Sequence, residues 1–297
     1  MRVVTLLPAA TEIVAGLGDT SVLVGISHEC DYPPDVQHLP RVTTTPIDPA
    51  AAGASIDRDV RRMHEAGQPV IALNAEQLRQ LAPDLIIAQE QCEVCAVSDG
   101  QAHRIAATLQ PPATVLSLRA RDLAGVWSDI RAVGVALNLE ARADELVLEL
   151  QSRLQLLRSR AGSPSLRVLC IEWLDPLFLA GHWVPELVAT AGGVSIGAQP
   201  GGHSTRRSWS EVAGLRPDLI LVMLCGFGVD RARIELDRLA CPEALELLSR
   251  VPTWIIDGNA YTSRGGPRVV DGAESIRSAI EQRAGDRVQA WQPAGVC

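Results

Sequence analysis

Two cysteines at C-x-x-C spacing, Cys92 and Cys95, are the residues whose types and spacing most directly suggest chemistry. They lie in the segment QEQCEVCAVS, residues 89 to 98. This spacing lets two thiolates bind one metal ion, as in zinc and iron–sulfur sites, and it also occurs in redox pairs. A self-contained zinc site would need a second pair of ligands at similar spacing, and the sequence has none. The remaining alternative is a pair of buried, inert thiols.

Two further cysteines, Cys30 and Cys225, also follow the ends of expected strands. We therefore predict that Cys30, Cys92, Cys95 and Cys225 converge and bind a transition metal or an iron–sulfur cluster, and we keep buried thiols as the alternative. The cysteines for which we expect no ligand role are Cys170, Cys241 and Cys297.

The composition excludes several classes of protein. The chain has 297 residues, of which 47% are hydrophobic and 21% charged, and its net charge is −8. That charge, without a basic run, argues against nucleic-acid binding. No apolar run is long enough to span a membrane, and Pro8 and Glu12 interrupt the N-terminal apolar run too early for a signal peptide. We therefore expect a cytoplasmic location, or a periplasmic one if a leader is missing.

An internal repeat indicates how these residues are positioned. Residues 76–92 read EQLRQLAPDLIIAQEQC, and residues 211–225 read EVAGLRPDLILVMLC. Each copy has a short helix, a Pro-Asp that ends it, a continuous apolar strand typical of a buried parallel sheet, and a cysteine. Ligands of such sheets bind beyond the carboxyl ends of the strands, which is where both cysteines fall.

The repeat predicts an α/β fold with two Rossmann-like lobes. We assign residues 1–120 to an N-terminal α/β lobe, 121–162 to a helical segment, and 163–297 to a C-terminal α/β lobe. Apolar residues at helical spacing predict one long connecting helix over 139–161. The first helix is expected after the strand RVVTLL, with Thr11 as its cap and Gly18 as its stop. A ligand cleft is expected between the lobes.

Loop histidines and aromatic side chains are the other candidates for binding. A neutral imidazole can coordinate cobalt, iron or zinc, and a large planar ligand needs apolar walls. A polar, Gly-bounded segment after the strand TWIID could hold amide or phosphate groups. The histidines are His28, His182 and His203, the aromatic walls are Trp173, Trp183 and Phe227, and the polar contacts are Asn259, Tyr261 and Arg264. The alternatives are a surface histidine, a core tryptophan and a structured turn.

Several sequence blocks together resemble a known family. They are HECDYP (28–33), QCEVCAVS (91–98), EWLDPLFLAGHWVPE (172–186), CGF (225–227) and DGNAYTSRGGPRVVDG (257–272). With the two repeats and the connecting helix, they resemble the helical-backbone substrate-binding proteins of ABC transporters for vitamin B12, haem and iron–siderophore complexes. The likeness covers nearly the whole chain and is greatest to a leaderless branch labelled cobalamin-binding proteins.

The resemblance implies a protein that binds a corrinoid such as cobalamin, or a related metal chelate, between its lobes. It adds Tyr32 and Gln91 to the ligand-binding candidates, and it implies that Glu76 and Glu211 dock on an ABC permease. The alternatives are ordinary first-turn helix acids at these two positions, a cytoplasmic metal or iron–sulfur protein, and an importer subunit whose leader is missing. No catalytic signature such as G-x-S-x-G or a P-loop is found, so we expect no enzyme.

Overall fold

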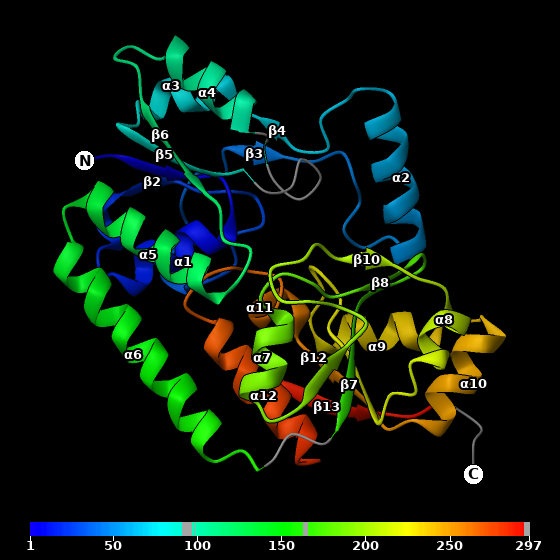
Figure 1. Cartoon of the computed structure of the whole chain (residues 1–297). Coiled ribbons are helices and arrows are strands. Elements are labelled where there is room, and N and C mark those ends of the chain that lie inside the picture. Colours follow the sequence, from blue (N-terminus) through cyan, green and yellow to red (C-terminus); the bar gives the residue numbers. More distant parts are fainter. Residues whose placement is uncertain (91–96, 98, 163–165, 294–297) are drawn as a thin grey trace. The chain divides into compact units, whose positions relative to one another are not determined.

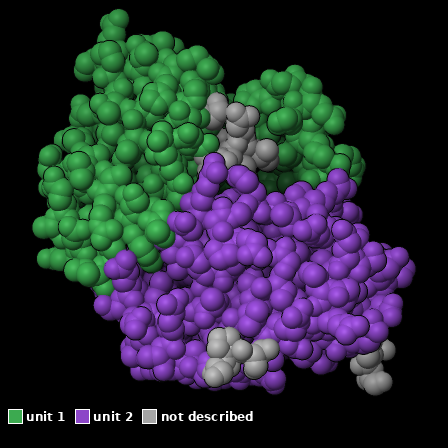
Figure 2. Space-filling model, viewed as in Figure 1, with its two compact units in different colours: residues 1–51, 55–120, 124–148 green, residues 52–54, 121–123, 149–297 purple. Residues whose placement is uncertain are grey.

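The computed structural model describes residues 1–90, 97, 99–162 and 166–293. The chain divides into two compact units (Figures 1 and 2). Unit 1 comprises residues 1–51, 55–120 and 124–148, and unit 2 comprises residues 52–54, 121–123 and 149–297. The predicted α/β fold is confirmed, because each unit combines helices with a sheet, which is parallel in unit 1 and mixed in unit 2.

Unit 1 is built on a four-stranded parallel sheet of order β2-β1-β5-β6. Its strands are β1 (Val3–Thr5), β2 (Leu23–Gly25), β5 (Leu85–Gln89) and β6 (Thr114–Leu118), and β3 (Thr43–Thr44) pairs with β4 (Ala72–Leu73). Its helices are α1 (Pro8–Gly16), α2 (Gly53–Glu65), α3 (Ala75–Leu81), α4 (Asp99–Thr108) and α5 (Leu123–Leu137), with short 3-10 turns at Thr20–Val22 and Pro34–Val36. Val4, Ile86 and Leu78 pack in its core, each at most 1% exposed.

Unit 2 is built on a seven-stranded mixed sheet of order β10-β8-β7-β11-β12-β13, with β9 also paired to β7. Its strands are β7 (Arg167–Leu174), β8 (Leu177–Leu179), β9 (Val194–Ile196), β10 (Thr205–Arg206), β11 (Leu219–Val222), β12 (Thr253–Ile256) and β13 (Val288–Trp291). Its helices are α7 (Val184–Thr190), α8 (Trp209–Gly214), α9 (Val229–Asp237), α10 (Pro242–Arg250), α11 (Gly258–Tyr261) and α12 (Val269–Ile280). The central strands β7, β11 and β12 are parallel, so their carboxyl ends share one edge.

The long helix predicted over 139–161 is α6 (Glu140–Ser159). It begins in unit 1 and ends in unit 2, so the helical segment predicted at 121–162 is divided between the units. Leu146, Leu150 and Leu154 lie on its buried stripe, each under 9% exposed. No helix among the described residues has both the length and the apolar character to cross a membrane.

The prediction that Thr11 caps the first helix is wrong. Helix α1 begins at Pro8, with Leu7 as its N-cap, because proline has the fixed φ of a first helical residue and lacks the N–H that would be left unpaired there. Thr11 lies inside the helix and is fully buried. Gly18 adopts a left-handed φ of 87° just beyond the helix end, as expected for a stop.

The sequence repeat is also a repeat of backbone geometry. In unit 1, Arg2 N donates to Asp84 Oδ2 at 2.7 Å while Asp84 N donates to Arg2 O at 2.8 Å. In unit 2, Arg167 N donates to Asp218 Oδ2 at 2.8 Å while Asp218 N donates to Arg167 O at 2.8 Å. We call each pair a strand-start clasp. The Asp of each Pro-Asp therefore fixes two parallel strands at the point where both begin.

Candidate functional site

His28 lies beyond the carboxyl end of β2 in unit 1, as predicted. Its backbone N donates to Thr43 Oγ1 at 2.8 Å, and its ring Nδ1 lies 2.6 Å from the same oxygen. Thr43 Oγ1 also lies 3.1 Å from Ser27 Oγ, so one hydroxyl links the histidine to the neighbouring serine. Burial, and then the charge of Arg41, lower the pKa of His28 below 6.5. The neutral form of the ring is therefore favoured, and this is the form that can coordinate a metal.

Cys30 lies in the same loop but is 1% exposed. Its Sγ is 3.0 Å from Thr11 Oγ1, which in turn is 2.6 Å from Thr5 Oγ1. Arg41 donates to the carbonyl oxygen of Cys30 at 2.6 Å and thereby fixes the loop. These contacts are those of a small buried thiol.

Three of the predicted residues, Gln91, Cys92 and Cys95, lie outside the described residues. Within the described part of the chain, no group of three or more His, Cys, Asp and Glu side chains could hold a metal ion. Cys225 is half-buried in unit 2, and Cys30 belongs to unit 1. The four-thiol site therefore stays a prediction.

Trp173 and Phe227 meet at the carboxyl edge of the sheet in unit 2. Trp173 lies near the end of β7, Phe227 follows β11, and their ring centroids are 5.4 Å apart with planes tilted by 39°. The guanidinium of Arg231 lies over the ring of Phe227, 5.0 Å from its centroid. Trp173 is half-buried, and Phe227 is 7% exposed. Trp173 is therefore the accessible ring of the pair, at the sheet edge where an α/β fold usually binds its ligand, and Phe227 supports it from the buried side.

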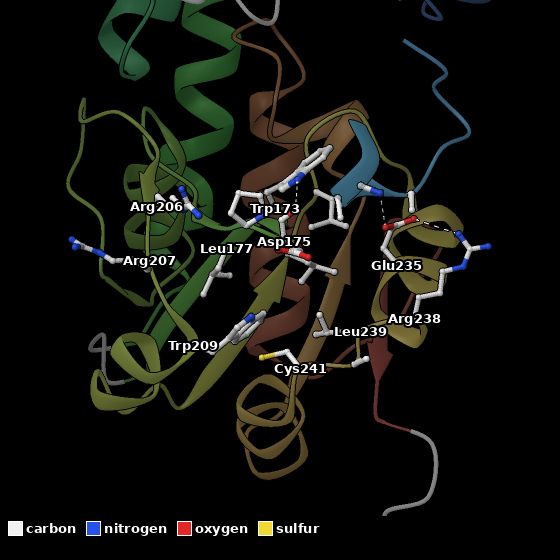
Figure 3. Close-up of a pocket in the computed structure, with 17 residues that line it drawn as sticks. Trp173, Asp175, Leu177, Arg206, Arg207, Trp209, Glu235, Arg238, Leu239 and Cys241 are labelled. Carbon is white, nitrogen blue, oxygen red and sulfur yellow. Dashed lines mark hydrogen bonds and ion pairs between the residues drawn. The ribbon is translucent and has the colours of Figure 1, made fainter. Parts of the chain in front are cut away.

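A pocket of about 470 Å³ opens beside Trp173 (Figure 3). It lies wholly within unit 2. Aromatic and aliphatic walls come from Trp173, Leu177 and Trp209, and arginines from β10 and the end of α9 stand around it. Sequence analysis missed this pocket, because its lining comes from segments as far apart as residues 52–54 and 238–241.

His182 and His203 are brought together on two adjoining loops of unit 2. His182 has a left-handed φ of 53°, and its N donates to Gly202 O at 2.6 Å while Gly201 N donates to His182 O at 3.0 Å. The two imidazole centroids are 5.7 Å apart with perpendicular planes. Burial, the ring of His203 and the charge of Arg121 lower the pKa of His182 below 6.5. No pattern in the sequence predicts the left-handed backbone of His182.

Trp183 lies in the core of unit 2. It is 5% exposed, and its Nε1 donates to Thr262 O at 2.9 Å. This position corresponds to the alternative of a core tryptophan, since little of the ring is accessible to a ligand.

The polar segment after β12 forms a short helix, α11. Asp257 caps it by accepting a hydrogen bond from Ala260 N at 2.8 Å. Arg264 is 7% exposed and donates to Asn259 Oδ1 at 2.8 Å. Tyr261 packs against the guanidinium groups of Arg268 and Arg287, at 4.7 and 5.0 Å. This arrangement corresponds to the structured turn.

Tyr32, the remaining ligand-binding candidate, lies in unit 1, and 42% of the residue is exposed.

The two glutamates of the repeat occupy matching positions in the first turns of α3 and α8. Glu211 forms a capping box with Ser208, whose backbone N donates to Glu211 Oε2 at 2.6 Å. The hydrogen bonds from the backbone and side chain of Ser208 lower the pKa of Glu211. Glu76 accepts instead from Arg79 Nη1 at 2.9 Å and Gln80 Nε2 at 3.1 Å on its own helix.

Comparison with known proteins identifies the family. Residues 3–245 match the family described as periplasmic binding protein. The chain belongs to the periplasmic binding protein family. This binding protein is 27% identical over 282 residues to the vitamin B12-binding protein of Vibrio cholerae, a match that covers 93% of the chain and 87% of the relative.

Two further matches describe the relatives of this binding protein. It is 25% identical over 287 residues to an uncharacterised ABC transporter substrate-binding lipoprotein of Bacillus subtilis, covering 94% and 79% of the two chains. A periplasmic haem binding protein from Pseudomonas aeruginosa superposes with a TM-score of 0.71 at 20% identity, over 99% of both chains. The fold is therefore shared along the whole length, whatever each relative binds.

Proposed function

We propose that this chain binds a corrinoid or a related metal chelate as the substrate-binding subunit of an ABC importer. The observation that carries the proposal is the match to a vitamin B12-binding protein over 93% of the chain. The half-buried Trp173 ring, packed against Phe227, adds the apolar surface that a large planar ligand needs.

Two features of this chain, each within one unit, are candidates for binding the ring of the chelate. The Trp173–Phe227 surface would bury its apolar face, with Arg231 fixing the orientation of Phe227. In unit 1, His28 is a separate candidate, because a neutral imidazole can coordinate a metal. The metal belongs to the ligand, so this chain needs no resident metal for the proposed function.

Titration of the purified protein tests the proposal. Cyanocobalamin, aquocobalamin and haemin are added in turn while heat and visible absorbance are recorded. A dissociation constant in the micromolar range or tighter is expected for one of them, corresponding to about 8 kcal/mol or more. Absence of heat and of any spectral change with all three ligands would count against the proposal.

Docking on a permease extends the same proposal. Glu76 and Glu211 are exposed first-turn acids at matching positions, one in each unit. Delivery to an importer requires that the protein work outside the cytoplasmic membrane, and cell fractionation tests this. The replacements Glu76→Gln and Glu211→Gln should leave chelate affinity unchanged and weaken capture by permease-containing membranes. Equal capture by the double variant would exclude docking through these acids.

A further inference from the structure

The pocket in unit 2 adjoins the aromatic surface proposed to bind the chelate. Trp173 contacts Phe227 and also lines the pocket, so one side chain forms a wall of both. The pocket reaches past the carboxyl ends of β7 and β11, where Leu174 and Leu224 line it. A group attached to a chelate seated on Trp173 would therefore enter the pocket directly.

The walls of the pocket suit a flat apolar group. Trp173 and Trp209 lie on different sides of it, with Leu177 between them and Leu239 beside Trp209 (Figure 3). Its volume of about 470 Å³ falls within the roughly 300–1,000 Å³ typical of sites that bury most of a small molecule.

The charged residues of the lining favour an anion. Arg206, Arg207 and Arg238 line the pocket, opposed by the carboxylates of Asp175 and Glu235. Glu235 is already engaged. Its Oε2 accepts from Gly53 N at 2.9 Å, and its Oε1 lies 3.1 Å from Arg231, outside the lining, and 3.8 Å from Arg238. The charge that remains is positive, and a guanidinium can bind phosphate through two parallel hydrogen bonds.

We propose that this pocket receives an aromatic, anionic side arm of the chelate. For a corrinoid this is the nucleotide arm, in which a flat heteroaromatic base is joined through a ribose to a phosphodiester. The base would stack between the tryptophans, and the phosphodiester would bind Arg206 and Arg238. This inference rests on the proposed function and narrows its substrate class to complete corrinoids. It disfavours corrinoids without the arm, and it disfavours haem, which carries carboxylates but no aromatic arm.

The test compares cyanocobalamin with cobinamide, which has the same ring but lacks the arm. Calorimetry should show that the wild-type protein binds cyanocobalamin about tenfold or more tightly, the effect of one charge-assisted hydrogen bond. Arg206→Ala and Arg238→Ala should each remove much of this preference and leave cobinamide affinity within about twofold. Arg250→Ala is the matched control, because Arg250 is an exposed arginine of unit 2 that does not line the pocket.

Trp209→Leu tests the aromatic wall in the same way and should weaken cyanocobalamin alone. Equal wild-type affinity for the two corrinoids would overturn the inference and leave the proposed function intact. A preference that survives in both arginine variants would also overturn it. If neither corrinoid binds the wild-type protein, the proposed function fails together with the inference.

Discussion

At the scale of single residues, His28 links the candidate site to pH. Its imidazole is half-buried, bonded to Thr43 and close to Arg41, and its pKa lies below the ordinary value of 6.5. Protonation therefore favours the unfolded chain, in which the ring titrates normally. The stability due to the neutral ring is complete above about pH 6.5 and is lost as the pH falls through that value toward the folded-state pKa.

We therefore predict that the free energy of unfolding is smaller at pH 5.5 than at pH 7.5. Urea denaturation at constant salt measures it at each pH. His182, whose pKa is lowered in the same direction, contributes to the same decrease. The variant His28→Gln should show a shallower pH dependence than the wild type. An unchanged slope in this variant would show that His28 is not one of the groups responsible.

The aromatic pair gives a second prediction at this scale. Trp173→Leu and Phe227→Leu should each weaken binding of the chelate about tenfold, since a packed aromatic side chain removes a large apolar area from water. Because the rings lie 5.4 Å apart, the double variant should lose less than the sum of the two single losses. Calorimetric titration of the four proteins measures this coupling, and strict additivity would argue that the pair does not act as one surface.

The sequence predicted where a residue lies in the fold when that residue comes directly after a strand. His28, Cys30, Trp173 and Phe227 lie close to the carboxyl ends of strands, as parallel sheets require. The partners of these residues could not be predicted. Thr43, for example, meets His28 only because residues 26 and 41 pair across a loop.

At the scale of elements, the two strand-start clasps are the clearest consequence of the sequence repeat. Each uses one carboxylate oxygen to accept a backbone N–H of the neighbouring strand. Their residue types could be predicted, since Pro-Asp recurs at the same offset, but the hydrogen bonds depend on strand register and could not.

Removing either carboxylate should destabilise its unit. We predict that Asp84→Ala and Asp218→Ala each lower the free energy of unfolding by about 1 kcal/mol, the usual net contribution of one hydrogen bond. Asp286→Ala, at an exposed position, is the control and should change stability by less than about 0.5 kcal/mol. Chemical denaturation measures all three, and losses no greater than that of the control would contradict the role given to the clasps.

Two short strands at one side of the unit 2 sheet were beyond prediction for another reason. Strands β8 and β10 have three and two residues, and they pair in antiparallel orientation although helix α7 and strand β9 lie between them in the sequence. Segments this short carry no periodic pattern, so only tertiary contacts define them. The pocket beside them was missed for the same reason, because Arg206 is part of β10.

At the scale of the whole molecule, ligand binding and stability are linked. A ligand that binds only the folded chain adds about 2.7 kcal/mol at a concentration of 100 times its dissociation constant. For units of this size we expect a rise in melting temperature of roughly 5–10 °C. Differential scanning calorimetry with and without cyanocobalamin measures the shift. An unchanged transition at such a concentration would contradict specific binding to the native state.

The fold class, the repeat and the long helix could all be read from the sequence, because each rests on a pattern that runs along many residues. The assignment of chain segments to the two units could not be predicted from the sequence. Residues 52–54 and 121–123 belong to unit 2, whereas the residues on both sides of each segment belong to unit 1. No local property of such three-residue segments distinguishes them from their neighbours, since long-range contacts alone assign them.

The hydrogen bond from Gly53 N to Glu235 joins residues 182 positions apart and occupies the first turn of α2. During synthesis, a nascent chain that has reached residue 148 already contains all the segments of unit 1. The carboxylate that satisfies the first N–H of α2 is made only when Glu235 is added. The start of this helix therefore reaches its final state late in biosynthesis, and a chain that stops short of residue 235 would leave it open to proteases.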